Sequence, residues 1–193
     1  MSRILVAGIG NIFQGDDAFG VEVVQELARR SLPAETRVVD FGIRAYDLAY
    51  ALTDGCEAAI LVDAASRGQP PGTPYLIEPD VAQLGQLESS ALDAHSMNVV
   101  QVLQLAESIG ALPGQLYLVG CEPADLAEES GRLGLSEPVR AAIPQAIAMI
   151  ESLVGSLLSL PLLPSLENTD SASAPFTATE PITKSPERKD TQS

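Results

Sequence analysis

The chain has 193 residues, enough for a single domain with a sizeable core. Its 26 acidic and 11 basic residues give a formal net charge of −15. This charge argues against nucleic acid as a partner, because binding to phosphates depends on Lys and Arg. We find no stretch of about 20 apolar residues and no basic leader with a cleavage site, so we expect no membrane span and no signal peptide. The sequence therefore predicts a cytoplasmic protein with Cys56 and Cys121 reduced.

Short apolar runs alternate with amphipathic helical patterns along most of the chain. In chain order the predicted elements are a strand Ile4–Ala7, a helix after Asp17, a strand Arg37–Asp40, a helix from near Ala45, strands Ala58–Val62 and Pro74–Ile77, a helix containing Val99 to Ala106, a strand Leu116–Val119 and a helix from near Glu137 to about Leu158. This alternation predicts an α/β fold, a three-layer α/β/α sandwich around a mostly parallel twisted sheet of about five strands. Pro144 interrupts the last helix, where we expect a kink.

The composition changes after residue 160. The segment 161–193 is rich in Pro, Ser and Thr and poor in large apolar residues. Such a segment buries too little apolar surface to offset the entropy of ordering it. We therefore expect one domain over 1–160 and a disordered tail over 161–193. The alternative is a partner-binding segment around Pro161–Leu166.

The first strand leads into a glycine-containing loop with the sequence GIGNIFQGDDAFG. Gly8 and Gly10 match the first turn of a dinucleotide-binding unit, but Phe13 stands where that fingerprint has its third glycine. Asp16 and Asp17 then come directly before a helix, where two carboxylates would repel a pyrophosphate. The loop is therefore better suited to a cation, a polarised peptide or proton transfer.

Further polar residues follow the ends of other predicted strands. Asp40 ends the second strand, Asp63 follows the third, and His95, the only histidine, lies in a loop before the third helix. Ligands of parallel sheets bind beyond the carboxyl ends of the strands. Two carboxylates and an imidazole that converge there would form an O,O,N site for nickel or zinc, or supply general acid–base groups for hydrolysis.

Each candidate residue also has a plainer interpretation. Asp16 or Asp17 could cap the following helix, and Asp40 could accept hydrogen bonds from a neighbouring loop. Asp63 could be a simple turn residue, and His95 could lie on the surface. The sequence contains no nucleophile elbow, but Cys121 at the end of the last strand could pair with His95 as a nucleophile.

The motifs together resemble one known family. The run GIGNIFQGDDAFG, Asp63 within LVDAAS, His95 and the later run LVGCEPAD are similar to those of the [NiFe]-hydrogenase maturation endopeptidases. The resemblance covers about Arg3 to Leu158 and implies that Asp17, Asp63 and His95 contact nickel and carry the catalysis. It also implies that Asp16 and Asp40 are accessory. The usual motif has Gly after the acidic pair, whereas this chain has Ala18, a small residue from which we expect little effect.

This resemblance implies a specific activity. Members of the family remove a C-terminal extension from the precursor of the [NiFe]-hydrogenase large subunit, the expected partner, after nickel has been inserted. The nickel is carried by the substrate and acts as the recognition signal, and the family is grouped with aspartic-type endopeptidases. The alternatives are a non-catalytic sensor of nickel loading, a spore-protease-like peptidase of the same fold and a nucleotide-binding Rossmann domain. We expect a monomer.

Overall fold

The structure is a computed structural model that describes residues 2–79, 99–126 and 133–159, all within one compact unit, Met1–Leu160. The predicted tail over 161–193 lies outside the described residues. Five strands form a single sheet: β1 (Ile4–Ile9), β2 (Thr36–Gly42), β3 (Ala58–Ala64), β4 (Pro74–Ile77) and β5 (Gln115–Cys121). Their order across the sheet is β2-β1-β3-β5-β4. Only β4 runs antiparallel to its neighbour, so the prediction of a mostly parallel sheet is confirmed.

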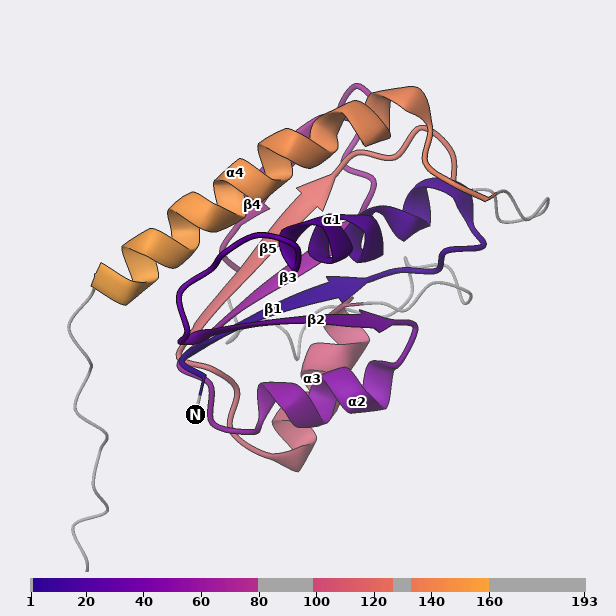
Figure 1. Cartoon of the computed structure of the whole chain (residues 1–193). Coiled ribbons are helices and arrows are strands. Elements are labelled where there is room, and N and C mark those ends of the chain that lie inside the picture. The colour runs from indigo at the N-terminus through magenta and orange to yellow at the C-terminus, as the bar shows by residue number, and fades with distance from the viewer. Residues whose placement is uncertain (1, 80–98, 127–132, 160–193) are drawn as a thin grey trace, which may run out of the picture. The chain divides into compact units, whose positions relative to one another are not determined.

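Helices cover both faces of the sheet (Figure 1). One face packs against α1 (Phe19–Leu27) and α4 (Glu137–Ser159), and the other packs against α2 (Ala45–Leu52) and α3 (Val99–Ile109). A short 3-10 helix, η1 (Gly15–Ala18), joins β1 to α1. The three-layer α/β/α sandwich expected from the sequence is therefore confirmed.

The alternation of side chains along each strand divides the core into two clusters. Along β1, Ile4 and Val6 point to the α1 and α4 face, while Leu5 points to the α2 and α3 face. Every residue of β1 and β3 is buried, as expected for central strands with helices on both sides. This alternation assigns a face to each polar residue at the ends of the strands.

Several elements are longer than the apolar runs of the sequence predicted. β2 continues to Gly42 and β5 begins at Gln115 and ends at Cys121, so both strands extend beyond their apolar runs. The helix α4 runs unbroken through Pro144 for 23 residues. By length and composition alone, α4 is long and apolar enough to cross a membrane, a test that a buried core helix also passes. In this structure its buried side chains belong to the core that α1 shares.

The order of the strands reverses direction at β1, so that consecutive connections run to opposite sides of this strand. The connection from β1 leads to β2 on one side, and the chain then crosses to β3 on the other side. In parallel sheets, crevices for ligands form beyond the carboxyl ends of the strands at such a reversal. The loop after β1 and the end of β3 are thus the expected place for a site.

Candidate active site

Two glycines allow the loop after β1 to fold tightly against the sheet. At Gly10, φ is +130°, and an added Cβ would lie 1.7 Å from the carbonyl oxygen of Asp17. At Gly20, an added Cβ would lie 2.1 Å from the carbonyl oxygen of Val62 in β3. Because any side chain at these positions would collide with backbone, glycine is needed to hold the two aspartates between the ends of β1 and β3.

Asp16 is fully buried, and its carboxylate accepts four hydrogen bonds. The donors are the backbone N–H groups of Ala124, Asp125 and Ser136, at 2.8, 3.0 and 2.6 Å, and the hydroxyl of Ser136 at 2.8 Å. Burial raises the pKa of Asp16, but the hydrogen bonds from Ser136, Ala124 and Asp125 outweigh it and hold the pKa below its ordinary value. Asp16 thus ties η1 to the segments that follow β5 and precede α4.

Asp17 has a very different environment from its neighbour. It is also buried, with 7% of its surface exposed, but from the described residues its carboxylate accepts only one hydrogen bond, from the N–H of Asn11 at 2.5 Å. Burial raises the pKa of Asp17, and the Asn11 bond only partly opposes that effect. Neither aspartate caps α1, whose N-cap residue is Ala18 and has no side-chain hydrogen bond.

Asp63 lies near the end of β3 and is the second member of an acidic pair. Its Oδ1 accepts a hydrogen bond from the N–H of Ala64 at 2.9 Å. Burial raises the pKa of Asp63 well above its ordinary value, and the nearby negative charge of Asp17 raises it further. A pair of buried carboxylates with raised pKa values is suited to holding and transferring a proton. The charge of Asp17 thus acts on Asp63 across the space between the loop after β1 and the end of β3.

The third predicted ligand, His95, lies outside the described residues. Within 2–79, 99–126 and 133–159, no three His, Cys, Asp or Glu residues form a group that could hold a metal ion. The predicted nickel-contacting set has only Asp17 and Asp63 in those ranges. Two carboxylates leave most coordination positions of a metal open, which suits contact with a metal held by another molecule.

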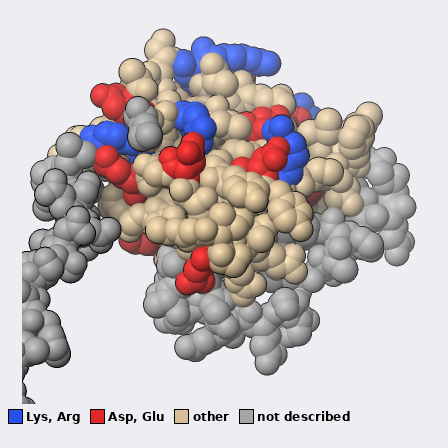
Figure 2. Space-filling view, turned by 90° about the horizontal axis from the view of Figure 1, so that it is seen from below, with Lys and Arg blue, Asp and Glu red and all other residues tan. Residues whose placement is uncertain are grey.

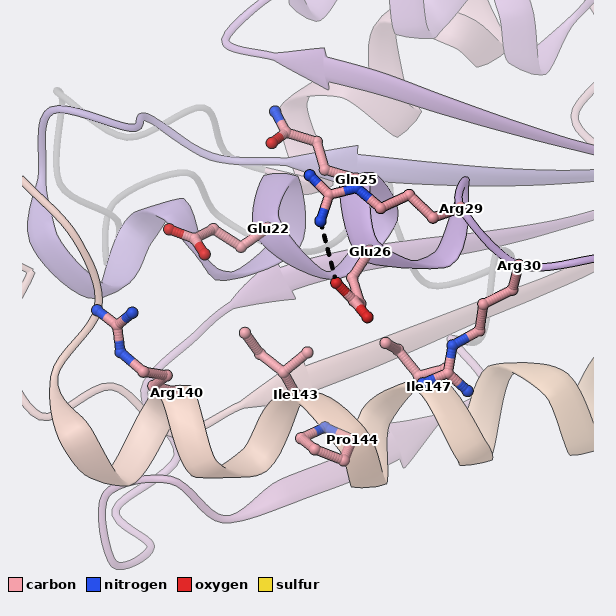
Figure 3. A pocket seen from close by; sticks show the side chains of 9 residues that line it. All are labelled: Glu22, Gln25, Glu26, Arg29, Arg30, Arg140, Ile143, Pro144 and Ile147. Carbon is pink, nitrogen blue, oxygen red and sulfur yellow. Dashed lines mark hydrogen bonds and ion pairs between the residues drawn. The ribbon is translucent and has the colours of Figure 1, made fainter.

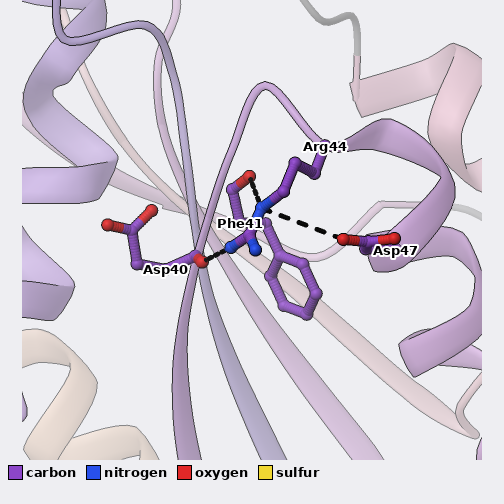
Figure 4. Close-up of polar contacts among 4 residues, drawn as sticks. All are labelled: Asp40, Phe41, Arg44 and Asp47. Carbon is purple, nitrogen blue, oxygen red and sulfur yellow. Dashed lines mark hydrogen bonds and ion pairs between the residues drawn. The ribbon is translucent and has the colours of Figure 1, made fainter.

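Asp40 lies on the other face of the sheet from Asp63. Asp40 pairs with Gly8, which pairs with Val62, so Asp63 is one residue further along and points to the opposite side. The side chains of Asp40 and Phe41 accordingly leave β2 in opposite directions (Figure 4). The Asp40 carboxylate accepts a hydrogen bond from the amide of Gln25 in α1, at 3.0 Å. The plainer interpretation of Asp40 as a hydrogen-bond acceptor is therefore confirmed, with a helix instead of a loop as the donor.

Sequence reasoning missed a group of residues on the β4 side of Asp63. Asp63 pairs with Gly120, and Gly120 pairs with Tyr75, whose ring occupies the space above the glycine. The Tyr75 hydroxyl donates a hydrogen bond to the carbonyl of Ala65 at 2.8 Å, and the guanidinium of Arg67 lies 5.2 Å from the ring centre. Burial, and next the charge of Asp63, raise the pKa of Tyr75. Tyr75 therefore forms a wall beside Asp63.

Glu122 directly follows β5, at the same end of the sheet as Asp63 and Tyr75. It is buried and accepts hydrogen bonds from the N–H groups of Arg67 at 2.6 Å and Gly68 at 3.2 Å. Its place in the run LVGCEPAD, three residues after the predicted strand Leu116–Val119, was the available signal in the sequence. Cys121, its neighbour, is buried, and burial followed by the charges of Asp16 and Glu122 raises its pKa to about 11. The thiol is therefore protonated near pH 7 and poorly suited to act as a nucleophile.

A groove of about 260 Å³ lies between α1 and α4, apart from these carboxylates (Figure 3). Its charged and polar lining comes from α1, from the turn after α1 and from one arginine of α4, and the other lining residues of α4 are apolar. The lining residues are Glu22, Gln25, Glu26, Arg29, Arg30, Arg140, Ile143, Pro144 and Ile147. Two of its arginines are engaged in ion pairs, Arg29 with Glu26 and Arg30 with Glu151. The groove contains no predicted site residue.

The chain belongs to the hydrogenase maturation protease family. The family model described as "HycI: Hydrogenase maturation protease" matches residues 21–153, more than half of the chain. This membership confirms the resemblance inferred from the motifs and places the protein among peptidases. It favours that assignment over a nucleotide-binding Rossmann domain and over a spore-protease-like peptidase.

Individual relatives agree with the family match. The hydrogenase expression/formation protein HupD of Bradyrhizobium diazoefficiens is 34% identical over 148 residues, which is 76% of this chain and 74% of HupD. The hydrogenase maturating endopeptidase HybD of Escherichia coli superposes with a TM-score of 0.68 at 28% identity, over 80% of this chain and 93% of HybD. A hydrogenase 2 maturation peptidase of a Thaumarchaeota archaeon superposes with a TM-score of 0.61 at 35% identity, over 80% and 99%.

Proposed function

We propose that the protein is an endopeptidase that removes the C-terminal extension of the precursor of the [NiFe]-hydrogenase large subunit after nickel insertion. Membership in the hydrogenase maturation protease family supports the reaction class. The observation that carries the proposal is the buried Asp17–Asp63 pair at the carboxyl ends of β1 and β3, with both pKa values raised. We further propose that the protein acts in the cytoplasm as a monomer.

The proposed chemistry uses the acidic pair for proton transfer. The oxygen of a water molecule adds to the carbonyl carbon of the scissile peptide bond, and its proton passes to the carboxylate of Asp17 or Asp63. The protonated acid then delivers a proton to the leaving amide nitrogen as the C–N bond breaks. This use of paired aspartates is the aspartic-type reaction that the family resemblance implies.

Nickel enters this proposal as part of the substrate. Asp17, Asp63 and His95 contact the nickel that the precursor already holds, and that contact positions the scissile bond. A substrate-bound metal also polarises a nearby carbonyl group as a Lewis acid. The protein needs no metal of its own for this role, which agrees with the few protein ligands proposed.

The test is incubation of the purified protein with nickel-loaded and with nickel-free precursor, followed by mass spectrometry. We expect loss of the C-terminal extension from the loaded precursor only. Asp17→Ala and His95→Ala should abolish cleavage, whereas Asp47→Ala, at an exposed position on α2, serves as the matched control. Full cleavage by both site variants would contradict the site, and an unchanged precursor mass with nickel-dependent binding would favour a non-catalytic sensor.

A further inference from the structure

We propose that an apolar surface at the carboxyl ends of β1 and β2 binds an apolar segment of the protein substrate beside Asp17. We define this surface, the apolar rim, by Ile12, Phe13, Ile43 and Tyr46, whose exposed fractions are 47, 62, 64 and 69%. The inference rests on the proposed function, which supplies a protein substrate. It adds where that substrate is held and by what chemistry.

The first part of the apolar rim is an ordered turn. Ile12 and Phe13 occupy its centre, between Asn11 and Gln14, and the N–H of Gln14 donates to the carbonyl of Asn11 at 3.0 Å. The N–H of Phe13 donates to the side chain of Asn11, also at 3.0 Å. The centres of turns usually carry Gly, Pro, Asn, Asp or Ser. Two large apolar residues at the tip of a hydrogen-bonded turn are therefore unusual, and exposed apolar surface of this kind indicates a site that binds a partner.

The second part follows β2 and is joined to the first. The N–H of Gly10 donates to the carbonyl of Gly42 at 3.1 Å, so the two loops leave the sheet side by side. The backbone around Ile43 is fixed by Arg44, whose guanidinium donates to the carbonyl groups of Asp40 and Phe41 (Figure 4). Ile43 therefore lies in a fixed loop beside the loop that carries Ile12 and Phe13, and Tyr46 follows in the first turn of α2.

Asn11 connects the apolar rim to the acidic pair. Its side chain and carbonyl organise the turn, and its own N–H donates to the carboxylate of Asp17 at 2.5 Å. A chain segment lying on the turn is therefore next to Asp17. This continuity with the candidate site identifies the occupant as the substrate segment that flanks the scissile bond.

The charge distribution favours an apolar occupant over a charged one. The side of the molecule that carries α2 and α3 shows a broad uncharged area (Figure 2). Tyr50 is a further exposed aromatic residue of α2. Arg44 bonds to backbone carbonyls and lies 3.9 Å from Asp47, so its charge is already engaged. Exposed aromatic and aliphatic side chains gain affinity by burial against apolar groups, and a few such residues dominate binding energies.

The experiment measures processing rate against precursor concentration for the double variant Phe13→Ser/Ile43→Ser. We expect KM for nickel-loaded precursor to rise about tenfold or more, with a much smaller change in kcat. The matched control is Leu76→Ser/Ile109→Ser, two exposed apolar residues on β4 and at the end of α3. The control should change KM less than about twofold, and both variants should unfold at temperatures close to wild type because all four side chains are exposed.

Direct binding separates failure of this inference from failure of the proposed function. Biolayer interferometry on immobilised nickel-loaded precursor should show the same loss of affinity in the Phe13→Ser/Ile43→Ser variant, whether or not the wild type cleaves. No cleavage by the wild type, together with binding that this variant loses, would contradict the proposed function and support the apolar rim. Equal KM and affinity in variant and control would overturn the apolar rim. Light scattering that shows a wild-type dimer dispersed by the variant, with unchanged processing, would overturn it in favour of self-association.

Discussion

Two carboxylate regions that meet in η1 differ in almost every physical respect. Asp16 is surrounded by four donors from Ala124, Asp125 and Ser136, and its pKa is lowered. Asp17 and Asp63 are buried, each accepts one hydrogen bond from the described residues, and both pKa values are raised. Buried charge that is fully hydrogen-bonded stabilises a fold, whereas buried charge that is poorly compensated is a cost characteristic of functional sites. Adjacent residues of one motif thus differ in environment: Asp16 supports the fold, and Asp17 has the environment of the proton-transfer group that we propose.

The different environments of Asp16 and Asp17 depend on two glycines, Gly10 in the loop after β1 and Gly20 in α1. Gly10 and Gly20 permit the backbone contacts that place Asp16 and Asp17 between β1 and β3. Asp16 then anchors the loop to distant parts of the chain, which fixes the position of Asp17. A rigid scaffold around a reactive group is the arrangement that catalysis requires.

The largest expected effect is the loss of stability when Asp16, the hydrogen-bonded carboxylate, is replaced. Replacing Asp16 with Ala removes the buried acceptor of four hydrogen bonds from Ala124, Asp125 and Ser136. We expect the free energy of unfolding to fall by about 3–5 kcal/mol, since a hydrogen bond to a charged group contributes about 1.5–3 kcal/mol and such contributions are not additive. Urea denaturation measures the change. Asp47→Ala, at an exposed site, is the control and should stay within about 0.5 kcal/mol of wild type.

The second prediction has the opposite sign. Asp63→Asn keeps the shape of the side chain and removes a charge that burial and Asp17 disfavour. We expect the free energy of unfolding at pH 7 to rise by roughly 0.5–2 kcal/mol while processing of the precursor is lost, as in other trade-offs between stability and activity. Denaturation and the processing assay are run on the same preparation. A destabilised variant would show that Asp63 supports the fold as Asp16 does.

The pH dependence of stability sharpens the same contrast. Because the pKa values of Asp17 and Asp63 are raised, the folded protein binds more protons than the unfolded chain above the ordinary value of 3.8. The contribution of protonated Asp17 and Asp63 to the free energy of unfolding is fully present below pH 3.8. It is lost as the pH rises through the pKa values of these groups in the folded protein. The advantage of Asp63→Asn over wild type should therefore be near zero at about pH 4 and grow with pH. The contribution of Asp16 runs the other way, being present above 3.8 and lost as the pH falls through its lowered pKa.

Much of this picture could be predicted from the sequence, and the remainder depends on distant contacts. Apolar runs located all five strands, and the motifs taken together indicated the family. The role of Asp16 could not be predicted, because Ser136 lies 120 residues away and no local pattern links the two. Tyr75 was missed for a similar reason, since only strand pairing sets it above Gly120 beside Asp63.

The smallest expected effect concerns Asp40, where strand pairing also decides the interpretation. The sequence places Asp40 at a strand end like Asp63, but its pairing with Gly8 turns it to the α1 face, where it accepts one bond from Gln25. That bond is partly exposed, so Asp40→Asn should change the free energy of unfolding by less than about 0.5 kcal/mol in urea denaturation. Stability and catalysis can then be read separately at this position. If Asp40 has an accessory role in the reaction, Asp40→Asn will process the precursor more slowly at unchanged stability. An unchanged processing rate would restrict the site to the face of the sheet that carries Asp63.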